Sequence, residues 1–288
     1  TFRLNVMARK LRSGRAGAVG VLMPVSQGSR RQMSDPFFMS LIALLADALA
    51  ARGYDLLLSR ADGGDPDWLD ALASSGRVDG VILIGQADQW QVIDRVAARY
   101  LPLVAWGAQL PGQAHCTVGT DNRRGGALAA RHLFDRGARG FAFFGDPVNP
   151  EVAQRLEGVR DELAAGGLST DIPVIRAGFS AQTAHEEISR WLDAGNPLPE
   201  AIVAASDVLA LSAVRALAER GHRVPADVRV TGYDDLLFAS QTMPPLTTVR
   251  QDLASGADHL VDLLLRRIGG EAAPSVVIEP TLVVRGSS

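Results

Sequence analysis

The sequence has little of several residue types, and each shortage excludes a class of protein. Cys116 is the only cysteine among 288 residues, which excludes a disulfide framework and a thiolate metal cluster. The five histidines are scattered and show no metal-ligand spacing. No apolar run approaches the ~20 residues that span a bilayer, and the first residues lack the apolar segment of a secretory signal. We therefore expect a protein of the reducing cytoplasm that does not enter a membrane.

Motifs of catalysis and nucleotide binding are also missing. No Gly-x-Gly-x-x-Gly follows the first apolar strand, which argues against a dinucleotide fold, and there is no Walker A sequence. Residues 178–182 resemble a nucleophile elbow but lack its second glycine. No carboxylate–histidine–nucleophile set can be assembled. We expect a protein that is not an enzyme and that uses no cofactor and no metal.

Apolar runs of four to seven residues alternate with longer segments of helical period along most of the chain. The apolar runs predict strands at Val19–Val25, Asp55–Ser59, Gly80–Gly85, Leu103–Trp106, Phe141–Gly145, Pro173–Ala177, Ala201–Ala205 and Val228–Tyr233, with two short ones at Ser275–Glu279 and Leu282–Arg285. The periodic segments predict helices at Pro36–Arg52, Pro66–Ser74, Trp90–Arg99, Arg123–Arg136, Pro150–Ala165, Ala181–Ala194, Val208–Arg220 and Leu253–Ile268. Strands that are apolar throughout and separated by helices form parallel sheets covered on both faces. The sequence therefore predicts an α/β fold of doubly wound parallel sheets, in two domains of roughly 130 residues each.

The N-terminal segment concentrates positive charge in a protein whose net charge is −3. The first 15 residues contain five basic side chains, Arg3, Arg9, Lys10, Arg12 and Arg15, and no acidic residue occurs before Asp35. Two interpretations stay open. The segment is either a solvated tail, or a short helix that orders when phosphates neutralise its charge and a partner buries Leu11.

Several motifs occur along the chain in a recognisable order. Near the N-terminus are Asn5, Ala8-Arg9-Lys10-Leu11 and Ser13-Gly14-Arg15, followed by an apolar strand. Downstream motifs are Asp35-Pro36-Phe37-Phe38, Val118-Gly119-Thr120-Asp121-Asn122, Gly232-Tyr233-Asp234-Asp235 and Leu246-Thr247-Thr248-Val249-Arg250-Gln251. In this order they resemble the lactose-repressor (LacI/GalR) family of transcription regulators, and the resemblance extends from Asn5 to Arg285.

The resemblance implies a type I periplasmic-binding-protein fold, with two doubly wound parallel-sheet lobes and an effector site in the cleft between them. We expect a hinge segment at residues 1–16, an N-terminal lobe at 17–137 plus 250–273, and a C-terminal lobe at 138–249 plus 274–288. It also implies a homodimer whose hinge helices contact operator DNA through Asn5, Ala8, Arg9 and Leu11, with Leu11 wedged between base steps. The family's helix-turn-helix would precede Thr1, so we expect this chain to dimerise and bind effector but to bind DNA weakly.

Polar and aromatic residues stand at the carboxyl ends of the predicted strands, where ligands sit in open α/β sheets. Such a mixture suits a sugar, because aromatic faces cover its C–H surfaces while carboxylate, amide and guanidinium groups bind its hydroxyls. The strand ends and the resemblance together give these candidate effector ligands: Asp35, Phe37, Phe38, Trp106, Thr120, Arg155, Phe179, Ser206, Asp234 and Gln251.

Some candidates have a structural alternative that the sequence leaves open. Asp35 can instead cap the helix that follows it, with the two phenylalanines in the core. Arg155 can be a solvated helix arginine, and Trp106 can pack in a core. Asp121 and Asn122, which follow Thr120, are expected to cap the next helix.

Two departures from the family pattern bear on the effector. Ser206 stands where the family has an asparagine, so a bidentate amide contact is weakened or made through water. Gly107-Ala108 stands where the family has an Asp-Arg pair, so this strand end offers the indole of Trp106 and no charge. The first change argues against a simple monosaccharide, and the second favours a glucoside or oligosaccharide over a purine or a small charged ligand.

The sequence thus predicts the effector-binding and dimerisation core of a LacI-type regulator that senses a sugar or glycoside. One alternative is a periplasmic sugar-binding protein of a transporter, which shares the fold and the cleft. A second alternative is an α/β enzyme acting on a small metabolite.

Overall fold

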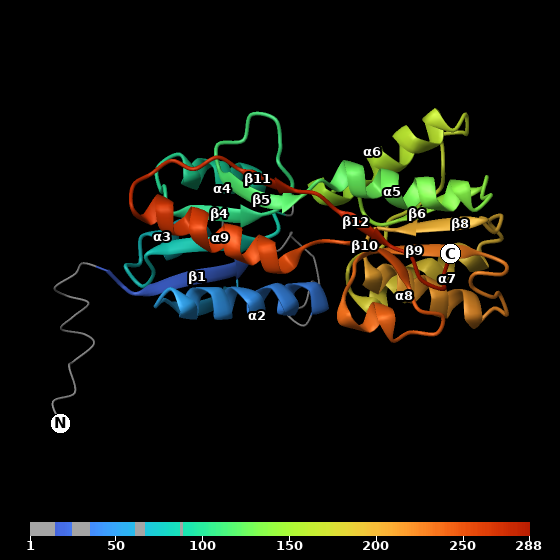
Figure 1. Cartoon of the computed structure of the whole chain (residues 1–288), viewed down its shortest axis with the longest axis horizontal. Helices are drawn as coiled ribbons and strands as arrows, with labels where there is room; N and C mark the ends of the chain where they lie inside the picture. The colour runs from blue at the N-terminus through green and yellow to red at the C-terminus, as the bar shows by residue number, and fades with distance from the viewer. Residues whose placement is uncertain (1–14, 25–34, 61–66, 87–88) are drawn as a thin grey trace, which may run out of the picture. The chain divides into compact units, whose positions relative to one another are not determined.

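The computed structural model describes residues 15–24, 35–60, 67–86 and 89–288 of the chain (Figure 1). These residues fold into two compact units, each with its own sheet and its own apolar core. The first unit contains residues 15–24, Phe38–Gly119 and Leu253–Val277. The second contains residues 35–37, Thr120–Asp252 and Ile278–Ser288.

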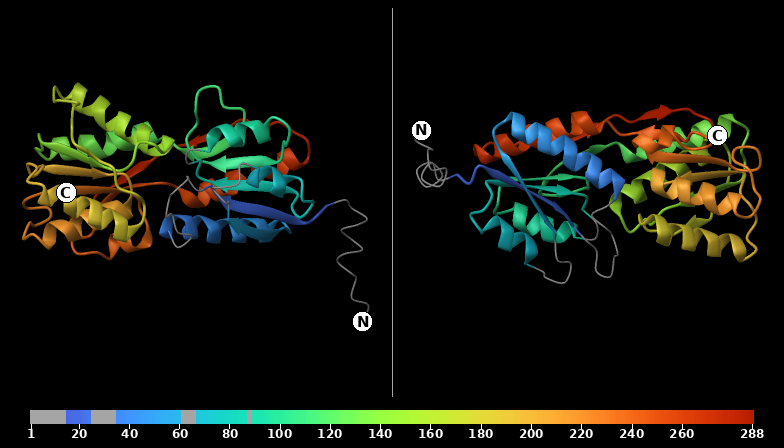
Figure 2. Two further views of the ribbon diagram at one scale, coloured as in Figure 1. Left: turned by 180° about the vertical axis from the view of Figure 1, so that it is seen from behind. Right: turned by 90° about the horizontal axis from the view of Figure 1, so that it is seen from below.

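In the described residues the first unit is built on a six-stranded sheet of order β11-β5-β4-β3-β1-β2. Its strands are β1 (Ala18–Met23), β2 (Asp55–Arg60), β3 (Gly80–Ile84), β4 (Leu103–Trp106), β5 (Cys116–Thr120) and β11 (Val276–Ile278). Pairing is parallel from β2 through β1, β3 and β4 to β5. The helices are α2 (Pro36–Ala51), α3 (Trp68–Ala73), α4 (Trp90–Ala97) and α9 (Leu253–Ile268). Figure 2 shows α2 beside α9 on one face of the sheet, with α3 and α4 on the other.

The second unit repeats the plan, and its described residues form a six-stranded sheet of order β12-β10-β9-β8-β6-β7. Its strands are β6 (Phe141–Phe144), β7 (Val174–Ile175), β8 (Ala201–Ala204), β9 (Arg229–Asp234), β10 (Thr247–Arg250) and β12 (Thr281–Val283). All pairs are parallel except β10 with β12, which is antiparallel. Its helical segments are α5 (Asn122–Asp135), α6 (Pro150–Ala165), α7 (Ala181–Asp193), α8 (Asp207–Ala218) and the 3-10 turn η1 (Leu237–Ser240). In Figure 1, α5 and α6 cover one face of the sheet and α7 and α8 the other.

The predicted fold class of two doubly wound, mainly parallel sheets is confirmed. Strands β1 and β3 are buried along their whole length, as expected for strands covered by helices on both faces. Two strands were not predicted, and these are β5 and β10. Both are short and carry threonines, so neither forms an apolar run. The buried hydroxyls of Thr120 and Thr248 bind partners far along the chain, Gln251 and Asp207.

The boundaries of the two units differ from those expected. The first unit was expected to continue to residue 137, but it ends at Gly119, and α5 belongs to the second unit. The later crossings, expected at residues 250 and 274, fall after Asp252 and Val277. The physical reason is that α5 packs closely against α6, a contact that helical periodicity cannot reveal.

Glycines permit this close contact between α5 and α6. A Cβ on Gly126 would lie 2.0 Å from the carbonyl oxygen of Arg155, and one on Gly158 would lie 1.8 Å from that of Arg123. Real Cβ atoms do not approach backbone oxygen so closely, so any other residue would force the helices apart. The two glycines therefore determine where α6 places Arg155.

We expect Gly126→Ala to destabilise the protein by roughly 2 kcal/mol or more, because overpacking against a backbone outweighs the helix propensity that alanine adds. The measurement is the free energy of unfolding from chemical denaturation. Gly178→Ala is the matched control, because no atom lies within 4 Å of the added methyl group. Equal stability of the two variants would show that the α5–α6 contact yields easily.

Candidate functional site

A chain of hydrogen bonds joins three of the predicted ligand residues in the second unit. The Thr120 hydroxyl donates to Gln251 Oε1 at 2.7 Å, and Gln251 Nε2 donates to Asp234 Oδ1 at 2.7 Å. All three side chains are buried. Asp234 ends β9 and Gln251 directly follows β10, so these two neighbouring parallel strands of the second unit bring both residues to one edge of its sheet. Thr120 ends β5, which is a strand of the other sheet. The carboxylate and the hydroxyl together determine the orientation of the Gln251 amide.

Arg155 projects from α6 and is held in a buried position. Its Nε donates to Asn122 Oδ1 at 2.8 Å, and its Nη1 donates to the carbonyl oxygen of Ala205 at 2.5 Å. The guanidinium carbon lies 3.7 Å from the centroid of the Tyr233 ring, a cation–π geometry. Only 7% of Arg155 is exposed, so the alternative of a solvated helix arginine is wrong. Tyr233, whose ring stacks on Arg155, directly precedes Asp234 in the chain.

Burial and charge act against each other at Asp234. Burial raises the pKa of its carboxyl well above the ordinary 3.8, while the positive charge of Arg155 and the hydrogen bond from Gln251 lower it. A buried carboxyl group needs donors if it is to ionise. The arrangement can therefore bind a neutral molecule that offers hydroxyl donors to the carboxylate and acceptors to the guanidinium.

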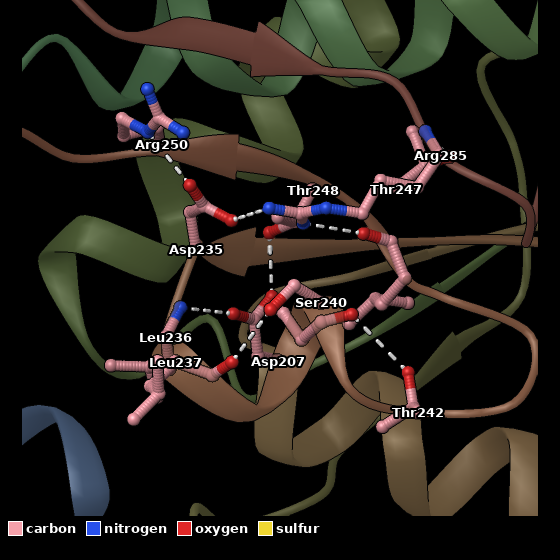
Figure 3. Close-up of polar contacts among 12 residues, drawn as sticks. Asp207, Asp235, Leu236, Leu237, Ser240, Thr242, Thr247, Thr248, Arg250 and Arg285 are labelled. Atoms are coloured by element: carbon pink, nitrogen blue, oxygen red, sulfur yellow. Dashed lines mark hydrogen bonds and ion pairs between the residues drawn. The ribbon is translucent and has the colours of Figure 1, made fainter.

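A second buried carboxyl group, Asp207, lies at the start of α8. Burial raises its pKa to about 7, although hydrogen bonds from the Thr248 hydroxyl and the Leu236 amide favour the charged form. The distances are 2.5 Å to Thr248 Oγ1 and 2.8 Å to Leu236 N. Figure 3 shows Asp207 facing the turn that follows β9.

Two candidates, Ser206 and Asp35, also cap helices, as does Asp121. Ser206 Oγ accepts from the Leu209 amide at 3.2 Å at the start of α8. Asp35 Oδ1 accepts from the Phe37 amide at 2.9 Å at the start of α2, so its capping alternative describes the structure. Asp121 caps α5, as expected, by accepting from the Arg124 amide at 2.9 Å.

Asn122 was expected to be a cap, and that expectation is wrong. Its Nδ2 donates to the Thr120 carbonyl at 3.0 Å, while its Oδ1 accepts from Arg155. Asn122 is instead a buried support for the guanidinium. The sequence identified the Asp-Asn pair but could not separate the two roles, because only the neighbouring helix supplies the arginine.

The aromatic candidates lie in different surroundings. Trp106 is 4% exposed, and its indole lies so close to Gly256 of α9 that an added Cβ would be 2.3 Å away. Trp106 and Phe38 are therefore core residues of the first unit, which is the alternative left open for both. Phe37 is half-buried, and Phe179 is half-buried against the core of the second unit.

Several expected features lie outside these contacts. The hinge residues Asn5, Ala8, Arg9 and Leu11 fall outside the described residues. A cavity of about 500 Å³ in the second unit is lined by residues of α7 and α8 together with Pro36 and Phe238, and none of the effector candidates lines it. Among the described residues there is no cluster able to hold a metal ion, and no helix long and apolar enough to cross a bilayer.

Sequence reasoning missed three residues that shape the site, namely Asn122 as a partner of Arg155, Tyr233 as its stacking surface, and Asp207. The available signal was the pairing of acidic with small residues at strand ends, as in Ser206-Asp207. That signal predicts a helix cap. It does not reveal that the Asp207 carboxyl group accepts a hydrogen bond from the distant Leu236 amide.

We expect the raised pKa of Asp207 to make stability depend on pH. The folded state holds the proton up to about pH 7, whereas the unfolded chain loses it near the ordinary 3.8. The contribution of this group is therefore largest below about pH 4 and is lost as the pH rises to about 7, by up to about 4 kcal/mol. Asp207→Asn cannot titrate, so its free energy of unfolding should fall less than that of the wild type between pH 5 and pH 8.

Denaturation of both proteins at several pH values gives the comparison, and the control is Asp171→Asn at an exposed position. Parallel stability curves for the wild type and Asp207→Asn would contradict the assignment.

Known proteins are similar to this chain in sequence and in fold. Residues 130–288 match the family of periplasmic binding protein-like domains. The HTH-type transcriptional regulator CelR of Thermobifida fusca is 31% identical over 98% of this chain and 84% of its own length. A solved transcriptional regulator CelR–cellobiose complex is 28% identical with a TM-score of 0.80, covering 98% of this chain and 89% of that chain.

A further similar structure is the lac repressor dimer bound to operator and the anti-inducer ONPF, with a TM-score of 0.85. The match covers 100% of this chain and 99% of the repressor chain, and at 24% identity it shows the shared fold. The expected resemblance and the type I periplasmic-binding-protein fold are thereby confirmed. The relatives are transcription regulators and not enzymes. The chain belongs to the LacI family of transcription regulators, and it forms the effector-binding core of such a regulator.

Proposed function

We propose that the effector is a neutral sugar or glycoside and that it is bound by the buried array of Thr120, Arg155, Asp234 and Gln251. The observation that carries the proposal is that a buried carboxyl group and a buried guanidinium lie in one hydrogen-bonded array. Adjacent sugar hydroxyls can donate to the first and accept from the second, which satisfies both charges without adding a third.

Each residue has a distinct part in this proposal. Asp234 accepts from one hydroxyl, and the planar fork of Arg155 donates to a neighbouring one. Gln251 and Thr120 hold the carboxylate in place through their hydrogen bonds. The Ser206 hydroxyl already accepts from the Leu209 amide, so its proton can still be donated to the ligand.

Two half-buried phenylalanines and one acidic residue extend the proposed site. Phe37 and Phe179 offer ring faces for the C–H surface of a sugar. Asp35 has one oxygen in its cap, and its carboxylate can accept a hydroxyl as well. The description of the related CelR structure as a cellobiose complex supports a glycoside as the ligand class.

We further propose that effector binding regulates DNA binding by a homodimer in the cytoplasm, where the operator lies. The regulators among the relatives and the operator-bound lac repressor dimer support this reading. A ligand alters DNA affinity only if it binds two arrangements of the protein with different affinity. The hinge residues Asn5, Ala8, Arg9 and Leu11 are the proposed DNA contacts, and the basic charge of the segment suits phosphates.

Titration calorimetry with cellobiose, glucose, ribose and adenine tests the ligand class. We expect a carbohydrate to bind, and we expect Asp234→Asn to weaken its binding by about tenfold or more, since a hydrogen bond to a charged group is lost. Burial raises the pKa of Asp234, so the asparagine should fold at least as stably as the wild type above neutral pH.

The matched control is Asp227→Asn, which removes an exposed carboxylate paired with Arg223 before β9 begins. Binding of adenine with no carbohydrate bound would overturn the proposed ligand class. Unchanged carbohydrate affinity in Asp234→Asn would overturn the proposed site.

A further inference from the structure

The turn after β9 has an unfavourable backbone conformation at two successive residues. Asp234 has φ 117° and Asp235 has φ 57°, and neither is glycine. Residues with a Cβ rarely adopt positive φ, because the side chain crowds the backbone. Such a turn persists only where its surroundings hold it.

Asp207 holds the inner side of this turn. Its Oδ2 accepts from the Leu236 amide at 2.8 Å, and its Oδ1 accepts from the Thr248 hydroxyl at 2.5 Å (Figure 3). Asp207 is fully buried. A Cβ on Gly232 would lie 2.3 Å from Asp207 Oδ1, so a glycine in β9 leaves room for the carboxylate. The start of α8 is thereby tied to the backbone two residues after Asp234.

Two arginines hold the outer side of the turn through Asp235. Arg250 Nε donates to Asp235 Oδ2 at 2.7 Å, and Arg285 Nη2 donates to Asp235 Oδ1 at 2.5 Å (Figure 3). Only 7% of the Asp235 side chain is exposed. Arg285 is itself fixed, because its Nη1 donates to the Leu246 carbonyl at 2.8 Å. Both oxygens of Asp235 are thus used by residues on or next to β10 and β12.

These anchors act on the same strand end as the proposed ligand array. Arg250 pairs with Asp234 in the register of β9 and β10, and Gln251, the next residue, donates to the Asp234 carboxylate. A shift of the turn would therefore change the direction of the Asp234 carboxyl and lengthen its bond from Gln251. The anchoring residues themselves are not among the proposed effector contacts.

We propose that Asp207, and Asp235 with Arg250 and Arg285, are positioning residues that hold the Asp234 carboxylate in the orientation required for effector binding. The proposal rests on the proposed function, because it assumes that Asp234 binds the effector. It adds that affinity depends on a clamp of side chains that do not touch the ligand.

The principal test is Asp235→Asn, in which an amide replaces one of the two acceptor oxygens facing the arginines. Titration calorimetry with cellobiose as the probe should show a loss of affinity of about tenfold or more. The matched control is again Asp227→Asn, which breaks an Arg–Asp pair before the opposite end of β9 and should change affinity by less than about twofold. If Asp235→Asn fails to fold, Arg250→Ala replaces it, because that side chain is 54% exposed, and a loss of about threefold is expected.

A second pair of variants separates positioning from packing. In Asp207→Asn the amide oxygen can still accept from the Leu236 amide, and the amide nitrogen can donate to the Thr248 hydroxyl, which can accept. Asp207→Ala removes both bonds. We expect affinity to fall in the alanine variant and to be largely rescued in the asparagine variant. Equal affinity in the two would contradict positioning by Asp207.

The outcomes distinguish this proposal from the proposed function. If Asp234→Asn loses binding but Asp235→Asn and Arg250→Ala bind as the wild type does, the clamp is overturned and the ligand site stands. If the wild type does not bind cellobiose, two measurements without ligand decide the matter, namely hydrogen exchange of the Leu236 amide and the carboxyl ¹³C resonance of Asp234. Faster exchange and a shifted resonance in Asp235→Asn, with no change in Asp227→Asn, support the clamp, and an unchanged resonance overturns it.

Discussion

The second unit depends on how the carboxyl group of Asp234 can be buried. A carboxylate removed from water must be stabilised or stay protonated. Here Gln251 donates a hydrogen bond to it, and the positive charge of Arg155 favours its ionised form. Gln251 in turn receives the Thr120 hydroxyl, so three strand ends must coincide for the array to form. The parallel sheet of the second unit brings two of these ends together, those of β9 and β10, whereas Thr120 comes from the end of β5, a strand of the other sheet.

Close backbone packing is the second constraint. Gly126 and Gly158 let α5 and α6 touch, and this contact places Arg155 against Asn122 and the Ala205 carbonyl. Gly125 of α5 makes room for the ring that stacks on Arg155, because a Cβ there would lie 2.3 Å from the Tyr233 hydroxyl. Small residues in these helices therefore determine where the buried guanidinium lies. Their role is geometric, and it reaches the ligand array only through the arginine.

The turn after β9 is also held by contacts within the protein. An unfavourable backbone at Asp234 and Asp235 is held by a carboxylate whose two oxygens both accept from arginines. In a family of regulators, a ligand must bind one arrangement of the protein better than another. Rigid placement of the ligand-binding groups makes that preference larger, because less of the interaction free energy is lost in ordering them.

The sequence by itself determined the fold class, most elements and the identity of the main polar residues. Apolar runs such as those of β1 and β3 have one physical reading, namely strands covered on both faces. The Gly232–Asp235 motif indicated Asp234 through its resemblance to the LacI family. By contrast, β5 and β10 could not be recognised as strands, because their threonines interrupt the apolar pattern. The hydroxyls of Thr120 and Thr248 bind the remote side chains of Gln251 and Asp207.

Only the tertiary structure decided which of several possible roles each of these residues and segments has. It made Trp106 a core residue through Gly256, turned Asn122 from a cap into a support for Arg155, and moved α5 into the second unit. Each of these outcomes depends on a contact between segments far apart in the chain. Local propensity and periodicity report the preferences of single segments, so they carry no information about which distant backbone or side chain will meet them.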